Sequence, residues 1–236
     1  ATDIRKICVR DRHKERSVPA SLITFDRNEL LLDPDIDVIV ELIDDADAAF
    51  DIVCTALRQG KAVVSANKKM IAEHLEELLA LQRSTGKPFL YEGAVCASIP
   101  IIRNLEEYYD NDLLKSLQAQ DLGFAESNPK LDTEGYDASY KLSLLLFHAF
   151  GTISNPKDIL RCGIQRLGEL ESRYAREKHF KIKLMAFASE QEGKLFSFIL
   201  PAFVSSDHPL YLTDAQYNGV QLETAFSENQ FFLGKG

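Results

Sequence analysis

Residues 123–141, which read GFAESNPKLDTEGYDASYK, gather charged side chains directly ahead of an apolar segment. Asp137 and Lys141 are four residues apart, so a helix that begins near residue 137 places them one turn apart on the same face. The residues that follow are apolar on nearly all sides, which predicts a buried helix. A lysine at the entrance of a buried helix needs polar partners, and the preceding loop offers the carboxylates of Glu126 and Asp132.

This spacing alone has an ordinary interpretation. Ion pairs between residues i and i+4 are common at helix ends, where they add little to stability. The other interpretation is a site at which the lysine and the carboxylates hold a ligand. The choice between the two depends on the rest of the chain.

Composition narrows the class of protein. The 236 residues suffice for one large domain or two small ones with a real core, and the net charge of -9 argues against binding to nucleic acid or to an anionic membrane. No apolar run approaches the length of a bilayer span, and the first residues lack a signal-peptide pattern. The cysteines stand apart without C-x-x-C spacing, which is typical of reduced thiols in a cytoplasmic protein: Cys8, Cys54, Cys96 and Cys162.

Strand and helix patterns alternate over the first ninety-odd residues. Apolar runs predict strands at residues 6–9, 38–43, 62–65 and 89–91. Strands that alternate with helices indicate a right-handed parallel α/β sheet of the Rossmann type. Ligands bind such sheets at the carboxyl ends of the strands, which here are residues 10–14, 43–44 and 66–68.

The pattern changes after Glu92. A loop of small residues leads into a helix from about residue 99 to 109, and a polar helix is predicted at 168–177. Alternating apolar and polar residues then predict antiparallel strands at 180–188, 195–204, 217–222 and 230–233. We therefore expect a nucleotide-binding domain at residues 1–95 and a second, α+β domain at residues 96–236.

A doubly wound nucleotide fold normally begins with a strand and a G-x-G-x-x-G turn that cradles pyrophosphate. This sequence begins inside what resembles the second strand, and it contains no such glycine motif. Either the chain binds no dinucleotide, or the first unit of the fold is missing from the sequence.

Three motifs together resemble the homoserine dehydrogenase family: SANKK at residues 65–69, EGAVCASIP at 92–100, and residues 123–141. They occur in the family's order, and the resemblance covers nearly the whole chain. It implies an oxidoreductase that reduces aspartate 4-semialdehyde to homoserine with a nicotinamide dinucleotide, on the route to threonine and methionine. It also implies a homodimer formed through the sheet of the second domain.

The resemblance further implies segments that this sequence does not contain. Family members begin with a strand and glycine loop that would precede Ala1, and they continue past Gly236 through a glycine-rich turn into a helix. Between Ser116 and Leu117 they carry a few dozen further residues, including a substrate loop of the type N-G-T-T-N-Y. We therefore hypothesise that the sequence joins segments of a longer chain, and an intact mass of 26.5 kDa would contradict this.

In an aldehyde reduction, negative charge develops on the carbonyl oxygen as hydride arrives, so a nearby proton donor lowers the barrier. The resemblance assigns this catalytic role to Lys141. The helix N-terminus and apolar surroundings disfavour its ammonium form whereas Asp137 favours it, so the sequence leaves the net pKa open.

The family's ligands for the substrate's amino group match Glu126 and Asp137, and Asp132 matches a further acidic position. Carboxylates suit an ammonium group because they act purely as acceptors. Asn128 stands where the family commonly has Asp, which leaves the local charge balance in question. A surface acid at a helix end is the alternative interpretation of Glu126.

The family's lysine that faces both nicotinamide and substrate matches Lys68, which follows a strand as the crevice rule requires. A solvated lysine at the start of a helix is the alternative. Ile43, Asp44, Ser65 and Ala66 line the same crevice, and we expect them to touch the nicotinamide ring or its ribose.

The strand that normally delivers the ribose-binding residue is followed by Arg10, Arg12, His13 and Lys14. A basic cluster at this place favours a 2′-phosphate and hence NADP(H) over NAD(H). Asp11 keeps NAD(H) possible, and a solvated charged loop is an equally good interpretation.

Four positions match a site where the family binds a monovalent cation, expected to be sodium, largely through backbone carbonyls: Glu92, Val95, Ala97 and Ile99. Oxygen ligands suit a hard cation, so side-chain identity matters little at the last three. Cys96 and Ser98 stand where family members often have glycine. Cys96 has no nearby histidine and is expected to be a packed residue rather than a nucleophile.

Two other functions remain open. One is another two-domain dinucleotide-dependent reductase that acts on a different small aldehyde or imine. The other is a non-catalytic paralogue that binds a ligand or a partner. Loss of Lys141, Asp137 or Glu126 would mark such a paralogue, and all three residues are present.

Overall fold

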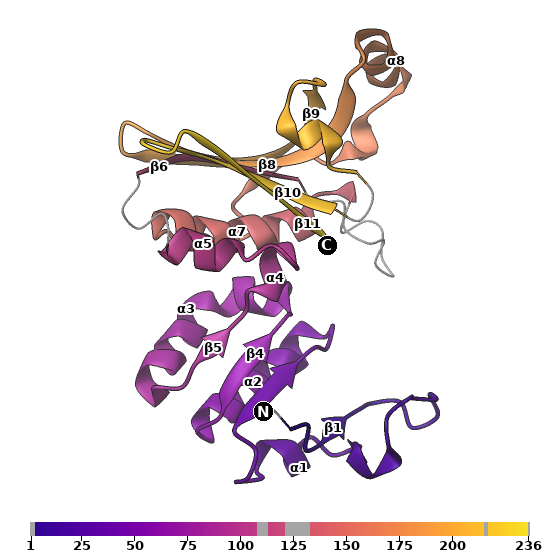
Figure 1. Ribbon diagram of the computed structural model, residues 1–236, viewed down its shortest axis with the longest axis vertical. Helices are drawn as coiled ribbons and strands as arrows, with labels where there is room; N and C mark the ends of the chain where they lie inside the picture. The colour runs from indigo at the N-terminus through magenta and orange to yellow at the C-terminus, as the bar shows by residue number, and fades with distance from the viewer. Residues whose placement is uncertain (1–2, 108–112, 121–132, 215–216, 236) are drawn as a thin grey trace. The chain divides into compact units, whose positions relative to one another are not determined.

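Figure 1 shows the computed structural model of the chain, in which residues 3–107, 113–120, 133–214 and 217–235 are described. The chain forms two compact units. Unit 1 comprises Ala1–Met70 and His74–Tyr91, and unit 2 comprises Ile71–Glu73 and Glu92–Gly236. Among the described residues, no helix is both long enough and apolar enough to cross a membrane.

Unit 1 is built on a parallel sheet of three strands in the order β3, β4, β5. These strands are β3 (Val38–Glu41), β4 (Ala62–Ser65) and β5 (Phe89–Leu90). Helix α2 (Ala46–Arg58) follows β3, and helix α3 (Lys68–Thr85) follows β4. The predicted parallel α/β arrangement is therefore confirmed, and the carboxyl ends of β3 and β4 lie side by side in the sheet.

Two features of unit 1 differ from the prediction. The first strand pattern forms only β1 (Ile7–Cys8), which pairs with β2 (Ile23–Thr24) outside the three-stranded sheet; η1 (Ala20–Leu22) precedes β2 and α1 (Asn28–Leu31) follows it. The apolar run of β3 predicts a strand buried on both faces, but Val38 and Val40 are 46% and 60% exposed. The described residues thus leave one face of this strand open.

Helices α2 and α3 begin at capping residues of types that are common at helix starts, Asp45 and Asn67. The Asp45 side chain accepts a hydrogen bond from the Ala48 amide at the start of α2, and the Asn67 side chain accepts one from the Met70 amide at the start of α3. Each cap satisfies an amide that would otherwise lack a partner, which stabilises a helix by about 1 kcal/mol. Helix α3 then departs from helical geometry at His74.

Unit 2 holds a six-stranded sheet in the order β11-β10-β6-β8-β9-β7, antiparallel except for the β7–β9 pair. The strands are β6 (Leu114–Gln120), β7 (Leu160–Arg161), β8 (Lys181–Gln191), β9 (Lys194–Val204), β10 (Tyr217–Thr224) and β11 (Asn229–Lys235). The predicted antiparallel strands are therefore confirmed. Strand β6 runs unbroken through Ser116 and Leu117, and the missing segment expected between these residues stays a prediction.

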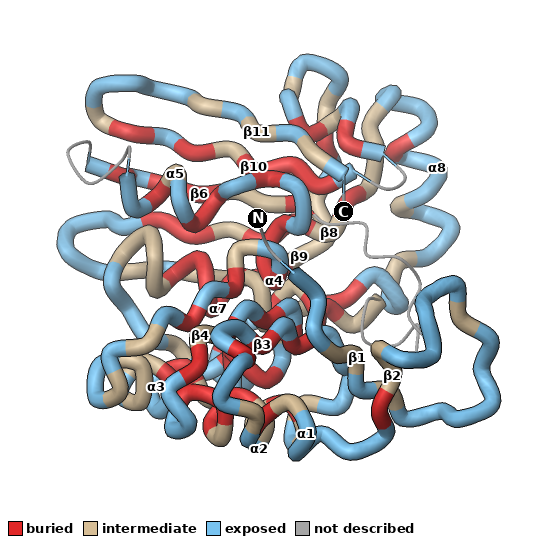
Figure 2. Tube along the Cα trace, turned by 60° about the horizontal axis from the view of Figure 1, so that its bottom comes forward, coloured by how far each residue is buried: buried red, intermediate tan, exposed pale blue. Residues whose placement is uncertain are grey.

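The helices of unit 2 include α5 and α7, which lie together against one face of the sheet (Figure 1). The helical elements are α4 (Gly93–Cys96), α5 (Ile101–Glu107), α7 (Tyr136–Phe150), η2 (Ile164–Arg166), α8 (Glu169–Lys178) and η3 (Pro209–Leu212). Buried residues concentrate on α7 and on the neighbouring strands (Figure 2). Leu142, Leu144, Leu145 and Leu146 are at most 1% exposed, so α7 is the buried helix that the sequence predicts.

Candidate functional site

The predicted ion pair forms within the first turns of α7. Lys141 Nζ lies 3.1 Å from Asp137 Oδ2, and the two side chains are only 15% and 9% exposed. A pair this deeply buried pays a large desolvation cost, unlike the solvated pairs common at helix ends. The Asp137–Lys141 contact is therefore not an ordinary solvent-exposed ion pair at a helix end.

The start of α7 is held by the sheet of unit 2. Gly135 precedes the helix with φ +79°, and a Cβ atom there would lie 3.3 Å from Ile199 of β9. The next residue, Tyr136, receives the Arg161 guanidinium on its ring at 3.9 Å from the centroid. Glycine allows both the backbone turn and the close approach to β9. These contacts fix where α7 begins on the sheet, and with it the position of Lys141 in the second turn of the helix.

A small cavity of about 20 Å³ lies beside Lys141, with room for about one water molecule. Its walls are mostly apolar: Ala138, Lys141, Leu142 and Leu145 of α7, Cys96 of α4, Ala119 and Gln120 of β6, and Leu184 and Ala186 of β8. The stem of Lys141 is thus surrounded by apolar groups, and its ammonium lies next to a carboxylate. Such surroundings suit a group that passes a proton to a bound molecule.

The Cys96 thiol in the wall of this cavity is not a nucleophile. It is 5% exposed, and burial raises its pKa to about 12, an effect that the charge of Lys141 only partly offsets. The expected packed, unreactive cysteine is therefore confirmed.

This burial predicts the order in which the thiols react. In the native protein, iodoacetamide is expected to label the exposed Cys8 and to spare Cys96 and Cys54 until urea unfolds the chain. Mass spectrometry of labelled peptides measures the order, and labelling of Cys96 as fast as Cys8 would contradict it. Because the thiol ionises first in the unfolded chain, the contribution of Cys96 to stability is expected to fall as the pH rises from 9.0 toward 12.

The loop with the predicted cation ligands is held at both ends. The Glu92 carboxylate accepts hydrogen bonds from the amides of Ile102 at 2.8 Å and Arg103 at 3.1 Å, so it caps α5. At the other end, Ser98 donates to the Lys235 carbonyl from its amide at 3.2 Å and from its hydroxyl at 2.6 Å. A Cβ at Gly234 would lie 2.6 Å from Ile99, so glycine is needed where β11 crosses the loop.

Between these anchors, Ala97 has φ 48° and ψ -98°, which is unusual for any residue but glycine. The backbone thus turns at Ala97 without a glycine. Within the described ranges, no three His, Cys, Asp or Glu side chains lie close enough to share a metal ion. Any cation held at Glu92, Val95, Ala97 and Ile99 would therefore depend on backbone carbonyls, and this site stays a prediction.

Polar groups gather at the carboxyl ends of β3 and β4, the place at which parallel sheets bind ligands, which we call the crevice of unit 1. Glu41, which the sequence analysis missed, accepts hydrogen bonds from the Ile43 amide at 2.6 Å and the Ser65 hydroxyl at 2.5 Å. The Asn67 side-chain amide donates to the Ile43 carbonyl at 2.9 Å. Ile43 and Ser65 are thus linked through Glu41, whose carbonyl accepts the Ala66 amide at 3.2 Å, and contact of these three residues with a cofactor stays a prediction. The available signal for Glu41 is that it is the one acid inside the apolar run 38–43.

The neighbouring charged candidates of unit 1 lie on or near the surface. Asp44 is exposed, and Lys68 is the first residue of α3. Arg10 and Arg12 are exposed on the loop after β1, and the Arg12 guanidinium lies 4.6 Å from the centroid of the Phe25 ring. The guanidinium groups of Arg10 and Arg12 thus lie on this loop, and their role in binding a cofactor stays a prediction. In unit 2, Glu126 and Asp132 lie outside the described residues.

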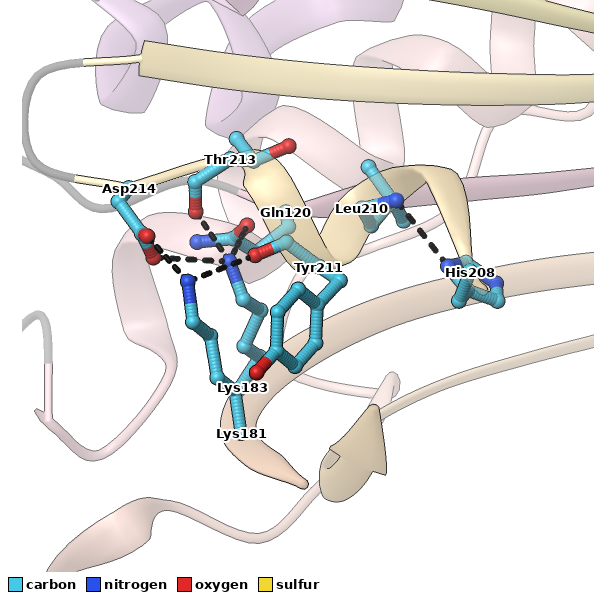
Figure 3. Close-up of polar contacts among 8 residues, drawn as sticks. All are labelled: Gln120, Lys181, Lys183, His208, Leu210, Tyr211, Thr213 and Asp214. Atoms are coloured by element: carbon cyan, nitrogen blue, oxygen red, sulfur yellow. Dashed lines mark hydrogen bonds and ion pairs between the residues drawn. The ribbon is translucent and has the colours of Figure 1, made fainter. Parts of the chain in front are cut away.

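A second lysine–carboxylate cluster in unit 2 was also missed by sequence reasoning (Figure 3). The Lys183 side chain is 4% exposed, and its Nζ donates to the Thr213 carbonyl, to Gln120 Oε1 at 3.1 Å, and to Asp214 Oδ1 at 3.3 Å. Lys181 binds the other oxygen of the same carboxylate. Burial lowers the pKa of Lys183, and the hydrogen bond from Lys181 is the largest cause that lowers the pKa of Asp214.

This cluster joins β6, β8 and the segment after η3. A Lys183→Met variant keeps most of the stem but leaves the buried acceptors Gln120 Oε1 and Thr213 O without this donor. We expect the free energy of unfolding to fall by about 2 kcal/mol, measured by urea denaturation. The exposed Lys194→Met in β9 is the matched control and should change it by less than about 0.5 kcal/mol. Equal effects of the two variants would contradict the structural role of Lys183.

Two known sequence families together cover nearly the whole chain. Residues 1–92 match the family described as homoserine dehydrogenase, NAD binding domain, and residues 101–236 match the family described as homoserine dehydrogenase.

Among curated relatives, the homoserine dehydrogenase of Lactococcus lactis is 30% identical over 264 residues, covering 99% of this chain and 62% of the relative. Among solved structures, a homoserine dehydrogenase from Thiobacillus denitrificans has a TM-score of 0.91 and 27% identity, covering 98% of this chain and 60% of that one. A hyperthermophilic archaeal homoserine dehydrogenase in complex with NADPH shares the fold, with a TM-score of 0.73, 23% identity, and coverage of 91% and 70%.

The chain therefore spans about 60% of the length of the first two of these relatives. The match to the catalytic family covers residues 101–236, which is more than half of the sequence and includes the Asp137–Lys141 pair. The match to the dinucleotide-binding family covers the crevice of unit 1. The chain belongs to the homoserine dehydrogenase family.

Proposed function

We propose that this chain carries the reaction centre of an enzyme that reduces aspartate 4-semialdehyde to homoserine with NADPH. The observation that carries the proposal is the buried Asp137–Lys141 pair at the start of α7, beside a small, mostly apolar cavity. Family membership supports the reaction, and the Asp137 carboxylate beside this lysine suits a substrate with an ammonium group.

In this proposal the reduced nicotinamide supplies the hydride, and the protein's residues manage the charge of the substrate. Lys141 Nζ donates a hydrogen bond to the aldehyde oxygen and passes a proton to it as the alkoxide forms. Asp137 orients that ammonium, and with Glu126 and Asp132 it holds the α-ammonium of the substrate. We assign Lys68 to the nicotinamide side of the crevice in unit 1.

For the dinucleotide, we propose that Ile43, Asp44, Ser65 and Ala66 bind the nicotinamide side. The residues fit such a ligand because their backbone groups converge at the carboxyl ends of two parallel strands. Arg10 and Arg12 favour NADP(H), since their exposed guanidinium groups can bind a 2′-phosphate. The NADPH in the archaeal relative agrees with this preference.

We also propose a sodium site formed by the backbone carbonyls of Glu92, Val95, Ala97 and Ile99. The loop suits a hard cation because its turn at Ala97 is fixed by hydrogen bonds on both sides. The assembly that we propose is a homodimer formed through the sheet of unit 2. Exposed apolar side chains on β9 and β11 support it, with Phe196 and Leu233 each about half exposed.

The test of the reaction is NADPH oxidation, followed by absorbance, with aspartate 4-semialdehyde as substrate. Homoserine formed in equal amount to the NADPH consumed supports the proposal. Reduction of other small aldehydes or imines in preference to this substrate would overturn it. The cation site is tested by the same assay with sodium exchanged for a bulky organic cation, which should lower the rate. The dimer is tested by size-exclusion chromatography with light scattering, which measures the mass of the assembly.

A further inference from the structure

We infer that Glu41 is a positioning residue for the nicotinamide side of the crevice: its carboxylate ties together the carboxyl ends of β3 and β4. This inference rests on the proposed function in one respect, namely that the crevice binds a dinucleotide. It assigns a role to a residue that makes no contact with a ligand itself and acts through Ile43 and Ser65.

The carboxylate of Glu41 is almost fully buried, at 3% exposed. Oε1 accepts the Ile43 amide at 2.6 Å, and Oε2 accepts the Ser65 hydroxyl at 2.5 Å. A buried acid is costly unless hydrogen bonds compensate it, and here each oxygen has a donor. An apolar side chain at this position would accept neither donor, whereas a carboxylate accepts one on each oxygen.

These bonds belong to a closed ring of four residues. The Ser65 hydroxyl donates to Glu41, and its oxygen accepts the Asn67 amide at 3.1 Å. The Asn67 side chain donates to the Ile43 carbonyl at 2.9 Å, and the Ile43 amide returns to Glu41. The ring therefore fixes the backbone at residues 43 and 65–67 in one arrangement.

The ring also determines what the crevice can offer a ligand. The Ser65 proton is directed at Glu41, so contact from Ser65 to a ribose or ring would come through its backbone. The Ile43 side chain is 40% exposed and is accessible to a planar ring. Asn67 also caps α3 through the Met70 amide at 2.9 Å, so the ring sets where that helix, and Lys68 in it, begins.

A purely structural role for Glu41 can be separated from a positioning role by a matched control in the same sheet. Lys61 is 4% exposed at the amino end of β4, and its Nζ donates to the carbonyls of Asp33 and Ile36. Lys61→Met therefore removes buried hydrogen bonds from unit 1 at the end of the sheet opposite the crevice. Loss of stability alone should affect both variants alike.

The experiment compares Glu41→Gln, Ser65→Ala, the double variant and Lys61→Met in the full chain. Glutamine presents one acceptor and one donor where Glu41 presents two acceptors, so one of its two bonds is lost or reversed. We expect Glu41→Gln to raise the Kd and the KM for NADPH about tenfold, with the KM for aspartate 4-semialdehyde changed less than about twofold. Lys61→Met should lower Tm comparably and leave the Kd for NADPH unchanged.

Ser65→Ala should raise the Kd for NADPH by a smaller factor, and the double variant should match Glu41→Gln because both substitutions break the same ring. If Glu41→Gln does not fold, Ser65→Ala alone tests the ring. An equal effect of Glu41→Gln and Lys61→Met on the Kd for NADPH, or no effect of Glu41→Gln, would overturn the positioning role.

The proposed function is judged separately, by the turnover of the unsubstituted chain with aspartate 4-semialdehyde. A chain that binds NADPH but lacks turnover refutes that function and leaves the comparison of Kd values to decide on Glu41. A chain that binds no NADPH overturns both proposals.

Discussion

Replacing Lys141 with methionine is expected to lower kcat for the reduction of aspartate 4-semialdehyde by about 10²–10⁴-fold, the usual contribution of a positioned proton donor. Methionine keeps the apolar stem in the cavity wall and removes only the ammonium beside Asp137. The Kd for NADPH should change less than about twofold, because this substitution leaves the crevice of unit 1 intact. Stopped-flow measurement of NADPH oxidation separates the chemical step from binding.

The Lys183→Met variant is the matched control for this prediction. Lys183 is also a buried lysine of unit 2 bound to a carboxylate, but its Nζ is held by Thr213, Gln120 and Asp214 around η3. The Lys183→Met variant should lower the free energy of unfolding without a comparable loss of kcat. Near-normal turnover of Lys141→Met, or an equal loss of kcat in the two variants, would refute the assignment of Lys141 as proton donor.

Local patterns in the sequence predicted much of the fold. The i, i+4 spacing of Asp137 and Lys141 and the apolar run after them indicated a buried helix with a paired lysine, and both features are present. Alternation of strands and helices indicated the parallel sheet of unit 1. Such features depend on residues that are close in the sequence. The repeat of a helix or a strand determines which of these side chains share a face, so the pattern can be read from the sequence.

The features that sequence reasoning missed depend on contacts between distant residues. Glu41 meets Ser65 24 positions along the chain, and Lys183 meets Thr213 30 positions along it. Neither pair has a local spacing that would indicate it. Glu92 shows a related limit: the resemblance predicted a cation ligand, whereas its carboxylate is engaged with the amides that begin α5. Any part in cation binding is therefore expected from its carbonyl.

Asp137→Asn is expected to lower the free energy of unfolding by about 3 kcal/mol, because it leaves the ammonium of Lys141 buried beside a neutral amide. For a chain of this size, that corresponds to a fall in Tm of roughly 6–12 °C, measured by calorimetry. The KM for aspartate 4-semialdehyde should rise as well, since one acceptor for the substrate's ammonium is lost. A change in KM without any change in Tm would contradict the buried pair as a stabilising element.

The double variant Asp137→Asn, Lys141→Met separates the two roles of the pair. Removing both charges also removes the cost of burying an ammonium that has lost the Asp137 carboxylate, so stability should recover by more than half of the loss seen in Asp137→Asn. Activity should not recover, because the proton donor is absent. If Tm and kcat instead recovered together, the loss of activity in Lys141→Met would reflect misfolding. Recovery of stability without recovery of kcat would show that the buried ammonium of Lys141 lowers stability and is needed for catalysis.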